Sequence, residues 1–333
     1  MVIIGWAFVL MAAALQGWSS AVDAANVEIG RGVDVLQRIS IIGDMLFGGA
    51  PNNKDMITHD ILSNANSITD VVNITNQPKE LNITFCPDLD SLFDAYFNGF
   101  RVDLSETPWK LLTASWSRYT ISERFGVSDM SLSPNYQFVL VSYTRPIKMY
   151  KTVKNLTRLA DLKSSVVEKF KSITSDVESK VTDFVAEYGS HYVDEYIVGD
   201  AVFQVFTYLP VFYTKFQKCF YSNYCSDTEQ SVFLSPVFAE YVGQVMTIGN
   251  KGEVEKWADT NLSSKSRIGG MYTSLFMMKI NPRLFNEIAP LMDDQSVLEM
   301  HLKTISIFLN DTVTKKWFAE VLDNHVKLRE INL

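Results

Sequence analysis

The pentapeptide Tyr188-Gly189-Ser190-His191-Tyr192 is the stretch that decides the fold of this chain. Before it, residues 159–188 carry apolar side chains at spacings of three and four, which predicts one long amphipathic helix. Gly189 follows at once, at the position where a left-handed residue commonly ends a helix. After it, residues 197–208 form an apolar run that favours a strand. The pentapeptide therefore marks a predicted helix-to-strand junction.

Outward from this junction, the chain alternates between predicted strands and long helical stretches. In chain order, the predicted elements are a buried strand at 138–143, mostly helical residues at 212–260 with apolar stripes at 212–224 and 237–248, an apolar strand at 271–280 opened by Gly269-Gly270, and helices at 284–333. Strands separated by long helical insertions indicate an α+β fold. Because no linker stands out, we expect one mature domain.

The N-terminus predicts secretion. Residues 2–15 are almost entirely apolar, but this run is shorter than the roughly 20 residues that span a bilayer. Small residues follow, so cleavage by signal peptidase after Ala21 or Ala24 is expected. A buried N-terminal helix is the alternative. No later segment is apolar over a length that would predict a transmembrane helix.

Sequons and cysteines agree with an oxidising, extracellular compartment. Five asparagines stand in Asn-x-Ser/Thr sequons and are candidate glycosylation sites: Asn73, Asn82, Asn155, Asn261 and Asn310. Cys219 and Cys225 are close enough in sequence to close a small disulfide loop. Cys86 is then left over, either buried as a small hydrophobe or paired with another chain. All three are free thiols if the chain is not secreted.

Composition and motifs exclude several classes of protein. The 333 residues carry a formal net charge of −8, without the basic surplus of a nucleic-acid binder. Phosphate-binding and dinucleotide-binding glycine motifs are absent, and the four histidines lack metal-ligand spacing: His59, His191, His301 and His325. We therefore expect no catalytic residue, metal or cofactor. A catalytic triad assembled only in space stays open, because its members need not be close in sequence.

The pentapeptide resembles the signature of the MACPF (membrane attack complex/perforin) family, which is an aromatic residue, Gly, Ser or Thr, His, and Phe or Tyr. The resemblance implies a bent antiparallel sheet of about four strands flanked by helical clusters. It also implies that Gly189 supplies the backbone angle of the junction and that His191 ties the helix end to a neighbouring strand. The family order of strand, helical cluster and bent strand matches 197–208, 212–262 and 267–280. Gly269-Gly270 is then the expected sheet hinge, with an ordinary turn as the alternative.

Scattered segments resemble one secreted group within that family, and the likeness runs from about Leu81 to the end. These segments are Phe85-Cys86 with Tyr96-Phe97 and Phe100, Ala114-Ser115-Trp116-Ser117, Gln204-Val205-Phe206, Ala239-Glu240 with Gly243-Gln244, Trp257-Ala258, and Val321-Leu322-Asp323-Asn324. The resemblance predicts a signal peptide at 1–24, an N-terminal segment at 25–80 and a MACPF domain at 81–333. It implies an extracellular factor at the egg surface. The implied partners are eggshell matrix and components of a receptor tyrosine kinase pathway, with peripheral membrane contact at most.

Pore formers of the family refold two helical clusters into membrane-spanning hairpins, whose strands each need about 9–11 residues. The first cluster is expected between an early strand near residues 109–116 and the strand at 138. That leaves residues 117–135, where Asp129 and Pro134 interrupt a return pass. The second cluster carries the predicted disulfide loop. The sequence therefore favours a non-lytic signalling protein, with a perforin-like pore former as the alternative.

Overall fold

The computed structural model of the chain describes residues 27–36, 39, 60–63, 68–76, 79–153, 161–174, 177–222, 225–248, 251–266, 270–293 and 295–331. The predicted signal peptide, the sequon at Asn155 and the hinge residue Gly269 lie outside these ranges. Within them, no helix combines the length and the apolar character needed to cross a membrane.

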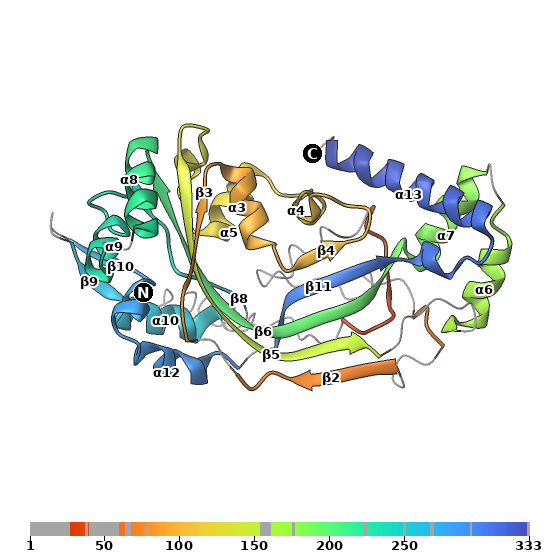
Figure 1. Cartoon of the computed structure of the whole chain (residues 1–333), viewed down its shortest axis with the longest axis horizontal. Helices are drawn as coiled ribbons and strands as arrows, with labels where there is room; N and C mark the ends of the chain where they lie inside the picture. Colours follow the sequence, from red (N-terminus) through yellow and green to blue (C-terminus); the bar gives the residue numbers. More distant parts are fainter. Residues whose placement is uncertain are drawn as a thin grey trace, which may run out of the picture.

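A nine-stranded sheet forms the centre of the molecule, and two long antiparallel strands run through all of it (Figure 1). These are β5 (Gln137–Thr152) and β6 (His191–Tyr208). In one half of the sheet the order is β2 (Thr69–Asn73), β5, β6, β11 (Ser296–Thr304) and β4 (Phe100–Val102), with β1 (Gly32–Val33) on the start of β6. In the other half, β3 (Asn82–Cys86) pairs with β5, while β7 (Tyr241–Val242) and β8 (Met246–Ile248) pair with β6.

The pairing is antiparallel throughout this sheet except between β11 and β4, which are parallel. Two further strands, β9 (Ser263–Lys265) and β10 (Met271–Thr273), form a separate antiparallel pair. β1 and β2 come from the segment before residue 81, so part of that segment belongs to the same sheet.

The two halves of the sheet meet at Gly199 of β6. Gly199 is paired with Pro146 of β5, and the register shifts at residue 147 of β5 and at residue 298 of β11. Such bulges bend a strand, and proline is tolerated inside a sheet mainly at bulges or edges. A Cβ atom at Gly199 would overlap the carbonyl oxygen of Arg145. A glycine between two bulges therefore allows the bend visible in Figure 1.

Three groups of helices enclose the bent sheet (Figure 1). Inside the bend lie α3 (Leu89–Tyr96), α4 (Pro108–Leu112) and α5 (Arg118–Phe125), followed by the 3₁₀ turn η2 (Asp129–Leu132). The opposite face is covered by α8 (Pro210–Tyr221), α9 (Asp227–Phe233), α10 (Lys251–Asn261), α11 (Met277–Ile280), α12 (Leu284–Ile288) and the 3₁₀ turn η4 (Ala289–Leu291). One end is closed by α6 (Ser164–Lys171), α7 (Glu178–Tyr188), the 3₁₀ turn η5 (Ile305–Phe308) and α13 (Thr312–Ile331).

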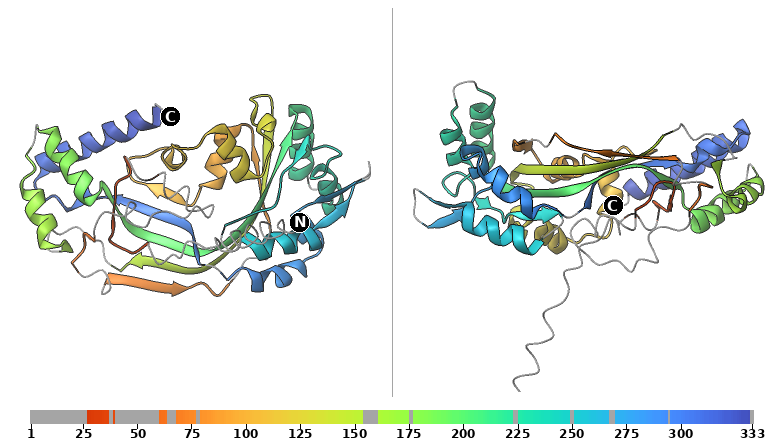
Figure 2. Two further views of the ribbon diagram at one scale, coloured as in Figure 1. Left: turned by 180° about the vertical axis from the view of Figure 1, so that it is seen from behind. Right: turned by 90° about the horizontal axis from the view of Figure 1, so that it is seen from below.

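Alternation along the long strands explains this arrangement. Phe138 and Leu140 of β5 pack with the helices inside the bend, whereas Val139 and Val141 pack with the helices of the other face. Successive side chains of a strand point to opposite faces, so β5 and β6 supply two cores at once. Seen from below, α8 and α13 lie at opposite ends of the molecule (Figure 2).

The α+β fold with a bent, mostly antiparallel sheet is confirmed, and the predicted strands at 138–143 and 197–208 belong to β5 and β6. Within the described residues, the sheet has nine strands and not about four. The additional strands β1, β4, β7 and β8 are two or three residues long. Such short strands carry no readable alternation in the sequence.

The predicted long helix at 159–188 is wrong in its continuity. α6 ends at Lys171 and α7 begins at Glu178. Phe170 of α6 stacks on Phe184 of α7 with ring centroids 4.3 Å apart. Because both helices bury their apolar stripes in one shared cluster, their periodicity resembles that of a single helix.

Four other predicted elements differ from what the structure shows. The stripe at 237–248 contains β7 and β8, which are strands because they pair with β6. The early strand near 109–116 is the helix α4, which begins at Pro108, a favoured first helical residue. The strand at 271–280 is limited to β10 and is followed by α11. Among the final helices, residues 296–304 form β11, which lies between β6 and β4.

Candidate functional site

The signature pentapeptide lies between α7 and β6, and its glycine is required there for two reasons. Gly189 has φ 90° and ψ 167°, a combination that is essentially limited to glycine. Its extended ψ differs from the left-handed cap that the sequence predicts. A Cβ atom at this position would also lie 2.6 Å from the main-chain nitrogen of Val33 in β1. Gly189 thus lets β1 approach the end of α7.

His191 and Ser190 are fully buried at this junction and are hydrogen-bonded to each other. The His191 ring nitrogen Nε2 lies 2.8 Å from the carbonyl oxygen of Asp103, in the loop after β4. Because a carbonyl oxygen can only accept, Nε2 carries the proton and Nδ1 accepts from the Ser190 hydroxyl at 3.0 Å. The same hydroxyl also lies 3.3 Å from a second acceptor, the carbonyl oxygen of Val33. The Ser190 oxygen accepts in turn from the main-chain nitrogen of Val35 at 3.2 Å. The signature thereby connects β1, β6 and the loop after β4.

The electrostatics of the junction keep His191 neutral. Burial lowers the pKa of His191 to about 4, against the opposing effects of the Asp103 carbonyl and carboxylate. Burial also raises the pKa of the Asp103 carboxyl, but hydrogen bonds from His301 and the Thr304 main-chain nitrogen outweigh it and lower the pKa overall. These two bonds measure 3.3 Å and 3.2 Å.

Ser190, His191 and Asp103 are the residue types of a hydrolytic triad, but they are not arranged as one. In a triad the histidine bonds to the carboxylate of the acid, whereas His191 bonds to the main-chain carbonyl of Asp103. Both Ser190 and His191 have an exposed fraction of 0%. In the described part of the chain, no group of three or more His, Cys, Asp or Glu side chains could hold a metal ion.

A second connected group, the Gln204 clamp, consists of Gln204, Gly243, Thr273 and Leu275. The Gln204 side chain is fully buried in β6 and makes three hydrogen bonds. Its amide nitrogen donates to the carbonyl oxygens of Gly243 and Thr273 at 2.7 Å and 2.9 Å. Its amide oxygen accepts from the main-chain nitrogen of Leu275 at 2.8 Å. The clamp fastens β6 to the loop before β8, to the last residue of β10 and to the segment that follows it.

The two helical clusters are linked to the sheet and to each other. The main-chain nitrogen of Gln244 in the second cluster donates to the carbonyl oxygen of Gly126 in the first, at 2.9 Å. In the first cluster, Arg101 of β4 forms an ion pair of 3.2 Å with Glu195 of β6. The first cluster occupies the whole span 87–136 between β3 and β5, so the range 117–135 expected from the sequence is too short.

The predicted disulfide is present, and it joins Cys219 in α8 to Cys225 just before α9. The third cysteine, Cys86, is a buried free thiol in the last position of β3. Burial raises its pKa to about 12, and the negative charge of Asp88 adds to this effect. The side chain therefore packs as a small hydrophobe, which fits the first of the two alternatives for Cys86.

The structure places Gly270 outside the nine-stranded sheet. Gly270 has φ 83° and directly precedes β10. Its carbonyl oxygen accepts from the Ser266 main-chain nitrogen at 3.0 Å, which closes the turn between β9 and β10. Gly270 thus occupies an ordinary turn, the alternative to a sheet hinge, while Gly199 lies at the bend. No local pattern in the sequence identifies Gly199 as the bend. Its position opposite Pro146 becomes visible only in the register of β5 with β6.

The described sequon asparagines are all exposed, at four separate places in the fold. Asn73 ends β2, Asn82 begins β3, and Asn261 ends α10. Asn310 lies in the connection between η5 and α13. Of the other described histidines, His301 bonds to the Asp103 carboxylate, and His325 bonds to Glu178 on the surface at 2.9 Å.

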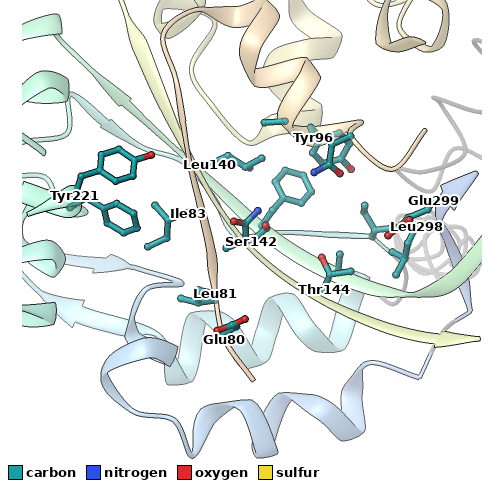
Figure 3. A pocket seen from close by; sticks show the side chains of 17 residues that line it. Glu80, Leu81, Ile83, Tyr96, Leu140, Ser142, Thr144, Tyr221, Leu298 and Glu299 are labelled. Carbon is teal, nitrogen blue, oxygen red and sulfur yellow. The ribbon is translucent and has the colours of Figure 1, made fainter. Parts of the chain in front are cut away.

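A groove of about 660 Å³ lies inside the bend, beside β3 and below α3 (Figure 3). We call it the concave groove. Its floor contains Leu140 and Phe203, which are buried, and its walls carry the hydroxyl groups of Ser142 and Thr144. The residues that line it come from β3, α3, β5, β6, β8, α8 and β11. The bend thus creates an open, amphipathic cavity that includes Asn82 in its wall.

No protein-family model matches the chain, and no curated protein matches it in sequence. Among solved structures, the chain is similar to GNIP1Aa from Chromobacterium piscinae, with a TM-score of 0.54 and 9% identity over 92% of this chain and 56% of that chain. It is also similar to a protein with a MAC/Perforin domain from Bacteroides thetaiotaomicron, with a TM-score of 0.41 and 12% identity over 92% of this chain and 61% of that chain. For astrotactin-2, a vertebrate-specific, perforin-like membrane protein involved in neuronal development, the TM-score is 0.37 and the identity 13%, over 85% of this chain and 98% of that chain.

The likeness to GNIP1Aa extends over almost the whole of this chain, which spans little more than half of that protein. At this identity the likeness concerns the fold. The chain therefore has the α+β fold of MACPF/perforin-like proteins.

Proposed function

We propose that this chain is a secreted, non-lytic MACPF-type protein of the torso-like kind, which promotes local receptor tyrosine kinase signalling through Torso. It acts outside the cell, in embryonic terminal patterning and growth control. Its partners are extracellular proteins of the eggshell matrix and of the receptor pathway, and its membrane contact is peripheral. It is not an enzyme, and it binds neither nucleic acid nor a cofactor.

The support for the signalling role is the resemblance of scattered segments to torso-like proteins. Two of these segments, Gln204-Val205-Phe206 and Gly243-Gln244, meet in the folded chain. The Gly243 main-chain nitrogen donates to the Val205 carbonyl oxygen at 2.9 Å, next to the Gln204 clamp. The shared segments therefore include the contact that fastens the second cluster to the central strand.

The observation that carries the non-lytic proposal is that both helical clusters contribute strands to the central sheet. β4 of the first cluster pairs with β11, while β7 and β8 of the second cluster pair with β6. A membrane-spanning hairpin must satisfy all its backbone groups within a closed barrel. A hairpin that included β4, β7 or β8 would first have to give up these strand pairs.

The disulfide of the second cluster adds a covalent restriction. It holds the Cα atoms of Cys219 and Cys225 5.2 Å apart. Six residues of extended strand span roughly 20 Å, so residues 219–225 cannot lie within one membrane-spanning strand. Any hairpin formed from this cluster would have to place its strands on either side of that loop.

A perforin-like pore-forming protein is the alternative, and the length of the first cluster favours it. Residues 87–136 exceed two strands of about 9–11 residues each. Phe100, Val102 and Leu104 also alternate with polar neighbours, which is the pattern of a barrel strand. Length by itself therefore does not separate the two functions, and a measurement on membranes is needed.

The deciding experiment measures dye release from liposomes of phosphatidylcholine with phosphatidylserine, using the glycosylated mature protein, and images the same samples by negative stain. We expect no leakage and no ring-shaped oligomers. Leakage with rings would replace the signalling proposal by the pore-forming alternative.

A matched variant tests whether the restraints hide a lytic activity. The double substitution Cys219→Ser/Cys225→Ser removes the covalent loop and leaves the rest of the cluster unchanged. We expect this variant to be as inactive on liposomes as the natural chain. If it forms pores while the disulfide-bonded chain does not, the chain is a latent pore former.

The signalling role has its own test. Cells that express the Torso receptor are exposed to the secreted chain together with the perivitelline fluid of the egg, and receptor tyrosine phosphorylation is measured. We expect phosphorylation to increase above that with fluid alone. An unchanged level would contradict the torso-like role, even if the liposome result is negative.

A further inference from the structure

Asn82 lies directly across from Ser142 in the pairing of β3 with β5, and Ser142 lies across from Phe203 of β6. Side chains at directly paired positions share one face of a sheet. The three side chains thus form a row across the bent sheet, and all three line the concave groove. Asn82 is exposed and begins an Asn-Ile-Thr sequon. Any group attached to its amide nitrogen starts at the wall of this groove.

The concave groove has the chemistry of a carbohydrate site (Figure 3). Leu140 and Phe203 close its floor and are buried, and its accessible apolar surface includes the ring of Tyr221, which is 69% exposed. The hydroxyl groups of Ser142 and Thr144 rise from the same face, and neither is hydrogen-bonded to another described side chain or to the described main chain. A volume of about 660 Å³ lies within the usual range of small-molecule sites. A sugar ring offers apolar C–H groups to the Tyr221 ring and hydroxyl groups to Ser142 and Thr144.

The other described sequons lack this setting. Asn73, Asn261 and Asn310 do not line the groove. A glycan at these three positions would extend from the surface into solvent. Of the four described sequon asparagines, Asn82 is the one that lines the concave groove.

We propose that Asn82 carries an N-linked glycan whose first sugars lie in the concave groove and are part of the folded structure. The proposal rests on the secretion included in the proposed function. In the attachment step, the Asn82 amide nitrogen bonds to the anomeric carbon of a lipid-linked oligosaccharide diphosphate. The amide loses one proton, the bond from the sugar to the diphosphate breaks, and the lipid diphosphate leaves with the electron pair.

The experiment compares two glycans on the same folded molecule. The chain is secreted from cells that make high-mannose glycans, and endoglycosidase H, which cuts between the first two sugars, is added to the native protein. Glycopeptide mass spectrometry follows the cut at Asn82 and at Asn310. We expect cutting at Asn82 to be at least about tenfold slower than cutting at Asn310, which corresponds to roughly 1.4 kcal/mol of protection. After denaturation the two rates should be equal.

Two variants separate packing in the groove from other causes of slow cutting. Ser142→Tyr fills the groove beside Asn82 without changing the sequon, and it should bring the rate at Asn82 up to the rate at Asn310. Thr84→Ser keeps a functional sequon next to the same strand pair and should leave the slow rate unchanged. A thermal melt of each variant establishes that it is folded before the rates are compared.

The outcomes test separately whether the Asn82 glycan lies in the concave groove and whether the chain is secreted. If Asn310 is occupied but Asn82 is not, or if Asn82 is cut as fast as Asn310, the groove proposal is overturned and secretion stands. If Ser142→Tyr is folded and still cut slowly at Asn82, the groove does not hold the sugars. If no sequon is occupied in secretion-competent cells, both the groove proposal and the secretion on which it rests are overturned.

Discussion

The ring nitrogen Nε2 of His191 donates a 2.8 Å hydrogen bond to the main-chain carbonyl oxygen of Asp103, which lies 88 positions earlier in the chain. The same aspartate uses its carboxylate to accept from His301 and from the main chain of Thr304 in β11. Through Asp103, the signature therefore connects the first helical cluster to two strands of the central sheet. This contact is the basis of the first two predictions.

Replacing His191 by alanine should destabilise the fold. The substitution leaves the Asp103 carbonyl without the His191 donor and opens a buried cavity, so the free energy of unfolding should fall by about 2–4 kcal/mol. Denaturant unfolding of the secreted protein measures this change. His325→Ala is the matched control, because His325 makes an exposed contact to Glu178 and should cost less than about 1 kcal/mol. Equal effects of the two substitutions would contradict the structural role of His191.

The stability of the chain should decrease in acid because of His191. Its pKa is about 4 in the folded protein and 6.5 as an ordinary histidine, so the unfolded chain binds the proton first. The stabilisation is fully present above about pH 6.5 and is lost as the pH falls towards about 4, a change of roughly 3 kcal/mol. The lowered pKa of Asp103 acts in the same direction at still lower pH. Denaturant unfolding at a series of pH values measures the slope, and His191→Gln should remove most of it between those limits. An identical slope in that variant would assign the effect to other groups.

Gly199→Val should be strongly destabilising, although Gly199 has an ordinary backbone angle. The added side chain would overlap the Arg145 carbonyl oxygen and the Leu298 side chain at the bend, so we expect a loss of at least about 2 kcal/mol in the free energy of unfolding. Gly252→Ala is the matched control, because a Cβ atom at Gly252 of α10 meets nothing within 4 Å. Alanine favours the helix, so the control should be neutral or slightly stabilising. A Gly199→Val protein with natural stability would remove the assignment of the bend to this residue.

Gln204→Leu should loosen the second cluster from the central strand. Leucine leaves the carbonyl oxygens of Gly243 and Thr273 and the Leu275 main-chain nitrogen without their buried partner, at a cost of about 3 kcal/mol. Hydrogen exchange should be faster at the Leu275 amide, with smaller changes in α7 and α13. Gln244→Leu is the control, since the Gln244 side chain is exposed and only its main chain takes part in the link to Gly126. Unchanged exchange at Leu275 in the Gln204 variant would show that the clamp does not hold this segment.

Local sequence patterns were sufficient for the helix-to-strand junction, for the strands within β5 and β6, and for the loop between Cys219 and Cys225. Each of these depends on residues close together in the chain: a glycine after a helical stripe, a long β-branched and aromatic run, or two cysteines at short range. The α+β class followed from them. The conformation of Gly189 was predicted only in part, because its extended ψ is set by the approach of Val33 from β1.

The amino-acid sequence by itself determined which segments are apolar enough to form long strands and helices and where the signature would be placed. Only the tertiary structure decided that residues 296–304 are a strand, that the apolar stripe at 159–188 contains two helices, and that the sheet bends at Gly199 and not at Gly270. The physical reason is the range of the interactions. Helical hydrogen bonds join residues four apart, whereas a strand is completed by partners far away in the chain, and the bend needs Gly199, Pro146 and two bulges on neighbouring strands to coincide.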